Sequence, residues 1–215
     1  MLHNLGEIYN LSPPSQGIVS LLILGILEKL NIDGKEDGKF IHAVTESIYH
    51  EFGSGVVLPK TGILWHNRGV SFSLEKNHIL SIKPGKKPLH TLTIAAARLH
   101  DGRVMVFGTR GGDGQPQTQA TIFHRYAIQN LNLQVALSNP RWIYGRNSGD
   151  HEDVLKLEDR FSEDTIKYLK DRGHTVFTLP AYCERTGQAG ALVRHPNGIM
   201  EGAFDPRSDG SAAGF

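Results

Sequence analysis

The residues best suited to chemistry lie in one glycine-rich stretch, from Gly108 to Gln117, with Gly111 and Gly112 at its centre. Because glycines let backbone N–H groups approach a ligand closely, this pair could donate hydrogen bonds to an oxyanion formed during acyl transfer. A phosphate cradle would use the same donors, but the stretch lacks a Gly-Lys-Ser/Thr ending and the dinucleotide fingerprint. A tight turn without a ligand is the third interpretation, and spacing alone leaves all three open.

Two further groups carry polar side chains next to predicted strands. His90 and Thr91 place an imidazole and a hydroxyl at adjacent strand positions, and Asn67 and Arg68 follow a short apolar run. A guanidinium can hold a carboxylate with two parallel hydrogen bonds, so Arg68 is a candidate for binding an acidic substrate. The alternative is that these groups are only the polar surface of strands.

Composition bounds the remaining classes of function. The chain has 215 residues, a net charge of +1, eleven histidines and the single cysteine Cys183. The balanced charge gives no argument for nucleic acid or an anionic membrane, and the histidines show no His-x-x-x-His or His-Glu-x-x-His spacing. We therefore expect no metal and no cofactor. The apolar run Ile18–Leu27 is too short to span a bilayer, and the start lacks a secretion-signal pattern, so we expect a cytoplasmic location.

The elements that must position these residues alternate between short strands and helices. Asp101-Gly102 and Asn197-Gly198 predict hairpin turns, and Ser162 is a natural cap for the helix that follows it. Helices are predicted at Ile18–Leu30, Thr118–Leu131 and Glu163–Arg172, and strands at Val56–Leu58, Gly62–His66, Leu89–Leu99, Arg103–Gly108, His174–Leu179, Gly190–His195 and Ile199–Phe204. Strand pairs flanked by helices indicate an α+β layered sandwich.

Taken in chain order, these stretches resemble the γ-glutamyltransferase family, and within it the cephalosporin-acylase-like bacterial branch. Ser12–Gly17 before an apolar helix resembles a segment of the family's large subunit. The motifs that resemble its small subunit are Phe52–Val57, Thr61–Leu64, Pro84–Leu92, Gly108–Gln117 and the closing Asp205–Gly210. The resemblance assigns residues 1–46 to a remnant of the large subunit and residues 47–215 to a small-subunit-like region, together forming one domain.

What the resemblance implies is an N-terminal-nucleophile hydrolase with a four-layer αββα sandwich. Such a precursor cuts itself before a threonine, which then attacks an amide through its hydroxyl, with its own α-amine as the base. By motif position, Gly111 and Gly112 would form the oxyanion hole. His90 and Thr91 would touch the substrate, and Ser47 and Tyr49 fall where a threonine and an asparagine usually support the nucleophile. The substrate would be a small amide, γ-glutamyl or another acyl compound.

The sequence departs from the family pattern in two places. Ser71 stands where γ-glutamyl enzymes carry the aspartate that binds the substrate α-amine, which favours another acyl group, one with a carboxylate held by Arg68. In addition, the helix motif Ile41–Glu46 runs directly into Ser47, so the segment that bears the nucleophilic threonine is missing, as is most of the large subunit. Thr45 is the only threonine near this junction, and it lacks the following strand.

Three hypotheses about activity follow from the missing threonine. The chain retains the small-subunit layers of an incomplete sandwich and is inactive alone, or it is a non-catalytic subunit that docks onto a complementary chain. The third is an active enzyme with an unrecognised nucleophile. Removing strands from a layered sandwich exposes apolar faces and sheet edges, so we also expect association, either with a complementary chain or as a homo-oligomer.

Overall fold

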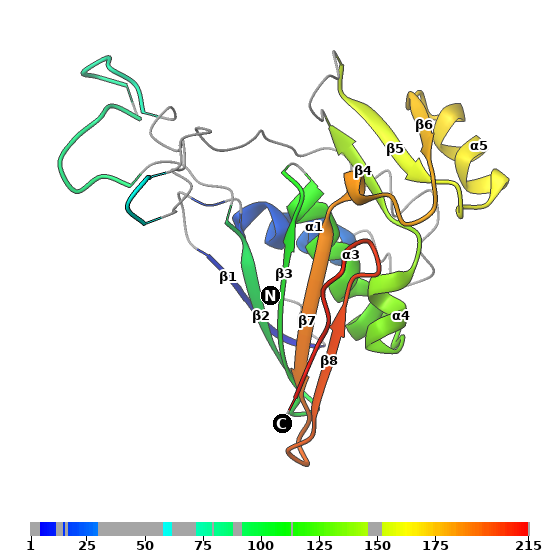
Figure 1. Cartoon of the computed structure of the whole chain (residues 1–215). Coiled ribbons are helices and arrows are strands. Elements are labelled where there is room, and N and C mark those ends of the chain that lie inside the picture. The colour runs from blue at the N-terminus through cyan, green and yellow to red at the C-terminus, as the bar shows by residue number, and fades with distance from the viewer. Residues whose placement is uncertain are drawn as a thin grey trace.

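The core of the molecule is a five-stranded antiparallel sheet. The computed structural model describes residues 5–11, 15, 17–29, 58–61, 72–78, 80–87, 92–112, 114–145 and 152–214. The strands lie in the order β1-β2-β3-β7-β8 (Figure 1). Their bounds are Gly6–Asn10 (β1), Ile94–Leu99 (β2), Val104–Arg110 (β3), Gln188–Arg194 (β7) and Met200–Phe204 (β8). The start of the chain is therefore hydrogen-bonded to β2, far away in the sequence.

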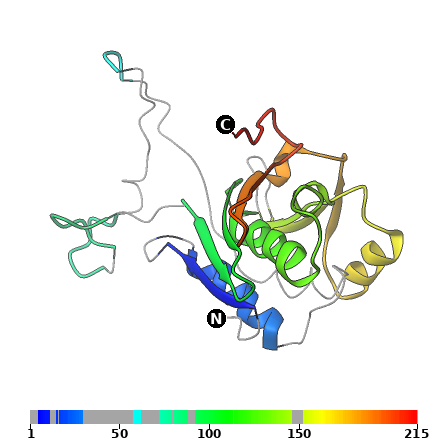
Figure 2. The same ribbon diagram turned by 90° about the horizontal axis from the view of Figure 1, so that it is seen from below.

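One face of this sheet is covered by helices α1 (Gly17–Lys29) and α3 (Gly114–Phe123), as Figure 2 shows. The strand side chains under the helices are mostly small, and this allows the helices to approach closely. The buried residues that the sheet contributes to this face are Ala95, Ala97, Leu99, Met105, Phe107, Ala189, Ala191, Val193 and Ala203. Alternate residues face the other way, as the two-residue period of a strand requires.

Helix α3 is buried along its whole length although it carries three glutamines. Each glutamine side chain has partners. Gln115 accepts from Thr93 Oγ1 at 3.0 Å, and Gln117 exchanges two 2.9 Å bonds with the backbone of Tyr144. Gln119 donates to the Thr93 carbonyl at 2.8 Å and accepts from Asn10 and Ser20. A buried polar group is tolerated only when it is hydrogen-bonded, so these bonds fix the helix against its neighbours.

A second, three-stranded sheet lies beyond α3 (Figure 1). Strands β4 (Trp142–Gly145) and β5 (Val154–Glu158) are antiparallel, and β6 (Val176–Leu179) runs parallel to β5. Helix α5 (Glu163–Asp171) connects β5 to β6. The π-helical segment His124–Ile128 and helix α4 (Leu133–Ser138) lead from α3 to β4, and a 3₁₀ turn at Glu184–Thr186 leads to β7.

Most predicted elements that fall on described residues are confirmed, with shifted ends. The helix expected at Ile18–Leu30 is α1, and α5 has the expected cap, because Ser162 Oγ accepts from Thr165 N at 3.2 Å. The helix expected at Thr118–Leu131 begins four residues earlier and ends in the π-helical segment. The strand expected at Leu89–Leu99 begins at Ile94 in the structure, while residues 88–91 lie outside the described part of the chain.

No helix of the described residues covers the second face of the five-stranded sheet, called the open face below (Figure 2). Ile94, Val106, Leu192 and Met200 point outward from it and stay largely exposed to solvent. The C-terminal residues fold back over one edge of this face, since a Cβ placed at Gly202 would lie 2.8 Å from the Ala212 side chain. An apolar sheet face left in contact with water is a common mark of a surface that binds something else.

Candidate functional site

The glycine-rich loop connects the end of β3 to the start of α3. Gly111 has φ +128° and Gly112 has φ +51°, both in the region that side chains disfavour. The loop then turns directly into the helix, with Gly114 N–H donating to Gly111 O at 3.0 Å and Gln115 N–H donating to Gly112 O at 3.2 Å. The two glycines are therefore required by the backbone path as well as by any chemistry.

Gly111 is also required by a close contact with a second glycine. A Cβ at Gly111 would lie 2.7 Å from Gly187 Cα, and a Cβ at Gly187 would lie 2.3 Å from the Arg110 carbonyl oxygen. Gly187 itself has φ +78°. Two backbones that meet this closely exclude every side chain, so the segment before β7 fixes the position of the loop.

The N–H groups of this loop are available to a ligand. Within the described ranges, neither Gly111 N–H nor Gly112 N–H donates to another backbone group. The loop stands at the N-terminus of α3, where the helix dipole places partial positive charge. Free backbone donors next to a helix N-terminus can stabilise a developing oxyanion, as acyl transfer needs.

An apolar hollow of about 600 Å³ lies on the open face of the sheet and extends to Arg110, the last residue before this loop. Thr109, Arg110 and Gln188 form its end beside the glycines, and Phe204 and the tail residues Ser211–Ala213 form its other side. The floor is lined by strand residues with small or apolar side chains, namely Ile94, Val106, Gly108, Gly190 and Leu192. Most ligand sites have this character, with an apolar floor and a few polar groups at one end.

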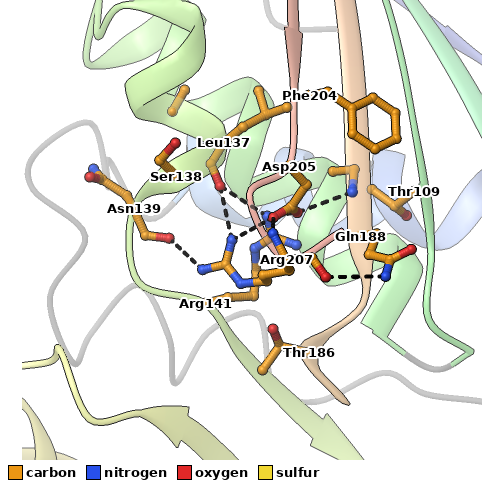
Figure 3. Close-up of polar contacts among 12 residues, drawn as sticks. Thr109, Leu137, Ser138, Asn139, Arg141, Thr186, Gln188, Phe204, Asp205 and Arg207 are labelled. Atoms are coloured by element: carbon orange, nitrogen blue, oxygen red, sulfur yellow. Dashed lines mark hydrogen bonds and ion pairs between the residues drawn. The ribbon is translucent and has the colours of Figure 1, made fainter. Parts of the chain in front are cut away.

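The closing motif Asp205-Pro206-Arg207 lies at the centre of a buried ionic network (Figure 3). Asp205 accepts from Arg141 at 2.8 Å and from Arg207 at 2.9 Å. Arg207 also binds both oxygens of Glu158, at 2.6 and 2.8 Å, and donates to the carbonyls of Leu137 and Asn139. The network thus joins β8, the end of α4 and β5. Sequence reasoning noted this motif only as a family ending, and it missed Arg141 and Glu158.

The pKa values in this network follow from burial and pairing. Burial raises the pKa of Glu158, but the hydrogen bonds from Arg207 and Arg160 outweigh it, so the net pKa is lowered. Burial lowers the pKa of Arg141 to about 10, while the neighbouring Asp205 carboxylate opposes this shift. Glu158 and Arg141 therefore stay charged at neutral pH, and each belongs to a buried ion pair.

The other predicted site residues lie outside the described part of the chain. This concerns the predicted substrate-binding residues Ser47, Tyr49, Asn67, Arg68, His90 and Thr91, together with Thr45 and Ser71. Their roles remain predictions, and Gly111 and Gly112 are the predicted site residues that the structure places. Among the described residues, no group of three or more His, Cys, Asp or Glu side chains could hold a metal ion, and no helix is long and apolar enough to cross a membrane.

Solved structures with the same arrangement define the class of fold. The cephalosporin acylase from Bacillus halodurans superimposes with a TM-score of 0.77 at 24% identity, covering 96% of this chain and 50% of that one. A gamma-glutamyltranspeptidase from Pseudomonas nitroreducens, complexed with L-DON, gives a TM-score of 0.59 at 23% identity, covering 80% of this chain and 91% of that one. The fold is thus α+β, an incomplete αββα sandwich, as expected from the sequence.

Sequence comparison then gives the family. The Gamma-glutamyltranspeptidase family profile matches residues 35–215, and the chain belongs to this family. It is 42% identical over 286 residues to the oxamate amidohydrolase proenzyme of Klebsiella pneumoniae subsp. pneumoniae, covering 99% of this chain and 54% of that protein. It is also 42% identical over 179 residues to the glutathione hydrolase-like YwrD proenzyme of Bacillus subtilis, covering 83% of this chain and 34% of that protein.

The lengths of these matches are informative. The chain spans about half the length of the Klebsiella relative. That match extends over 286 residues, whereas this chain has 215 in total. The relative therefore contains residues within the matched region that have no counterpart here.

Proposed function

We propose that this chain provides the oxyanion-binding part of an amidohydrolase that acts on γ-glutamyl or related small amides. The observation that carries the proposal is the Gly111-Gly112 loop, with its positive φ angles and its unused N–H donors at the start of α3. In amide hydrolysis the carbonyl oxygen becomes negatively charged as the nucleophile adds. Two backbone donors held in place before the reaction stabilise that charge without reorganisation.

The substrate that we propose is the amide of a small acid that carries a carboxylate. The match that covers nearly the whole chain is to a protein named for oxamate, which is itself such an amide. By the family resemblance, Ser71 would stand in place of the amine-binding aspartate of γ-glutamyl enzymes, and Arg68 lies three residues before it. A guanidinium can bind a carboxylate with two hydrogen bonds, and this supports a different acyl group.

We further propose that the chain alone neither cleaves itself nor hydrolyses amides. The nucleophilic threonine of the family falls between the Ile41–Glu46 motif and Ser47, where the sequence has no room for it. The Klebsiella match supports this, because it includes residues that this chain lacks. The attacking hydroxyl and the α-amine base belong to the same residue, so both roles are lost together.

A second candidate function is that of a partner subunit, and the open sheet face favours it. Exposed Ile94, Val106 and Leu192 form an apolar surface that lines the same hollow as Arg110, the last residue before the glycine loop. A chain that supplied the missing strands and the threonine would cover this face and place its nucleophile near the loop. The active unit would then be an assembly of two polypeptides.

The test compares the chain alone with the chain in the presence of the missing segment. Purified protein is assayed with oxamate, γ-glutamyl-p-nitroanilide and a glutaryl amide, and its bands are followed on a denaturing gel. It is then co-expressed with the part of the Klebsiella relative that has no counterpart here. A matched control carries alanine in place of the threonine of that added segment.

We expect no turnover from the chain alone and turnover only with the threonine-bearing segment, with oxamate preferred over the γ-glutamyl substrate. Two bands from the chain alone, with a new N-terminal threonine or serine, would disprove the proposed inactivity. Turnover without the added segment would favour an unrecognised nucleophile. If the added segment binds the chain but restores no turnover, the result supports the partner-subunit function and rejects the proposed role in catalysis.

A further inference from the structure

The buried network around Asp205 extends to the glycine loop through the backbone of β7. The Ala189 N–H donates to Asp205 Oδ2 at 3.1 Å, and the Asp205 N–H donates to the Ala189 carbonyl at 3.0 Å. Gln188 Nε2 donates to the Arg207 carbonyl at 3.3 Å. Figure 3 shows Asp205, Arg207 and Gln188 meeting at the start of β7, next to Thr109. The first two residues of β7 are therefore tied to the Asp205–Arg207 motif.

These two residues lie directly opposite the end of β3. Ala189 pairs with Thr109, and Gln188 pairs with Arg110, the last residue before the glycine loop. Gly187 then packs against Gly111, with space for neither to carry a side chain. A displacement of the start of β7 would move Gly187, and Gly111 would have to follow because the two backbones are in contact.

Asp205 is itself held rigidly. Its side chain is fully buried, and Arg141 and Arg207 bind different oxygens of the carboxylate. Arg207 is fixed in turn by Glu158 and by the carbonyls of Leu137 and Asn139. Buried ion pairs add little net stability compared with apolar packing, but they impose one geometry. Such a network is suited to setting the position of a neighbouring backbone.

We propose that Asp205 is a positioning residue for the oxyanion loop, acting through Ala189 and the Gly187–Gly111 contact on the direction of the Gly111 and Gly112 N–H groups. This inference rests on the proposed function, since the loop matters only as an oxyanion donor. In this role Asp205 does not contact the substrate. It acts through the backbone of β7.

The experiment observes the loop directly and needs no turnover. The full chain is labelled with ¹⁵N-glycine, and the amide resonances of wild type and Asp205→Asn are compared. Asn keeps the shape of Asp205 but removes the charge that holds Arg141 and Arg207. The matched control is Asp101→Asn, which removes the same charge from an exposed pair with Arg103 at 2.7 Å. A milder second variant, Arg141→Lys, keeps the charge but loses the planar fork beside Asp205.

In folded Asp205→Asn, we expect the resonances of Gly111, Gly112 and Gly187 to shift while those of Gly25 and Gly198 stay in place. Amide exchange at Ala189 should become about tenfold faster, because its acceptor loses its charge. Arg141→Lys should shift the same three glycines by less, and Asp101→Asn should shift none of them.

Unchanged Gly111 and Gly112 resonances in either folded variant would overturn the proposal. Equal shifts at all glycines would also overturn it, because the network would then support only the fold as a whole. If Asp205→Asn does not fold, Arg141→Lys decides between these outcomes. The assay with substrates is separate, so a loop that follows Asp205 but binds no oxyanion would reject the proposed function and leave the positioning role intact.

Discussion

The two faces of the five-stranded sheet are built from the same strands but differ in what surrounds them. On the covered face, Met105 and Val193 are completely buried under the helices. On the open face, their sequence neighbours Val106 and Leu192 are about half exposed, at 46% and 50%. The covered face is closed by the chain itself, through α1, α3 and the hydrogen bonds of the α3 glutamines.

This difference separates the parts of the molecule that hold the fold from those that meet other molecules. The buried core lies on the covered side, and the ionic network is also buried. The hollow opens on the other side, where Thr109 and Arg110, the last residues before the glycine loop, line one end of it. Contiguous exposed apolar patches are uncommon on monomeric proteins, and this supports the partner function proposed above. Changes on the two sides should therefore have different consequences.

The largest effect is expected in the buried ionic network, from Glu158→Gln. The variant removes one of the two carboxylates that pair with the buried guanidinium of Arg207, and removing one member of a buried ion pair costs about 3–5 kcal/mol. Urea unfolding at neutral pH measures this loss of stability. The exposed variant Asp101→Asn serves as the control, with an expected loss below about 1 kcal/mol. Equal losses in the two variants would mean that the network is not buried in solution.

The same carboxylate predicts a loss of stability in acid. The pKa of Glu158 is lowered in the folded protein from its usual value of 4.5. Its contribution is therefore complete above pH 4.5, and it is lost as the pH falls below that value toward the lowered folded pKa. Urea unfolding between pH 7 and pH 3 should show a decline that is weaker in Glu158→Gln. A decline of the same size in both proteins would assign the acid sensitivity to other carboxylates.

Truncating one side chain on each face of the five-stranded sheet tests whether the two faces differ in their contribution to stability. Met105→Ala leaves a cavity under the helices and should cost about 2–5 kcal/mol. Leu192→Ala, on the same sheet but half exposed, should change stability by about 0.5 kcal/mol or less. Both values come from urea unfolding. A large cost for Leu192→Ala would show that the open face is covered in solution.

Alanine at the loop glycines should have an intermediate effect. Gly111→Ala places a Cβ against Gly187 at φ +128° and should cost about 1–3 kcal/mol. Gly112→Ala places a side chain at the left-handed φ of +51° and should cost about 1–2 kcal/mol. Proline is unsuitable at Gly112, because its ring fixes φ near −65°. Thermal unfolding gives both values, and a larger loss for Gly112→Ala would contradict this order.

Leu192→Lys should cause the smallest change in stability. It should also cause the clearest change in self-association. A charge on the open face should reduce self-association and leave the free energy of unfolding within about 0.5 kcal/mol of wild type. Size-exclusion chromatography at several protein concentrations measures the association. If the wild-type chain elutes as a monomer at every concentration, the open face does not drive association.

Local signals in the sequence gave much of the fold. Ser162 and Gly173 marked the ends of α5, and Asn197-Gly198 marked the turn between β7 and β8. The strands β1, β4 and β5 were missed. Lys156 and Glu158 alternate with apolar residues in β5, which is typical of a half-exposed strand, but all five residues are buried through tertiary contacts. Helix α3 was placed too late because its first turns carry glutamines, and nothing in a single sequence shows that these have buried partners.

In the candidate site too, the residues with a local sequence signal were predicted, and those that depend on tertiary contacts were not. Gly111 and Gly112 were found because adjacent glycines are a local signal with a specific backbone meaning. Glu158 and Arg207 were not found as a pair, since they are 49 residues apart in sequence and meet only when β5 and β8 are both in place. The Gly187–Gly111 contact is likewise visible only in three dimensions.

The pairing of β1 with β2 determines where the chain can tolerate insertions, deletions and breaks. Helix α1 ends at Lys29 and β2 begins at Ile94, yet β1 and α1 pack against β2 and α3. Each doubling of the connecting segment costs only about 0.6 kcal/mol of closure entropy. The scaffold can therefore gain or lose a long insert between these elements with little penalty, and a break there leaves two fragments that can reassemble by complementation.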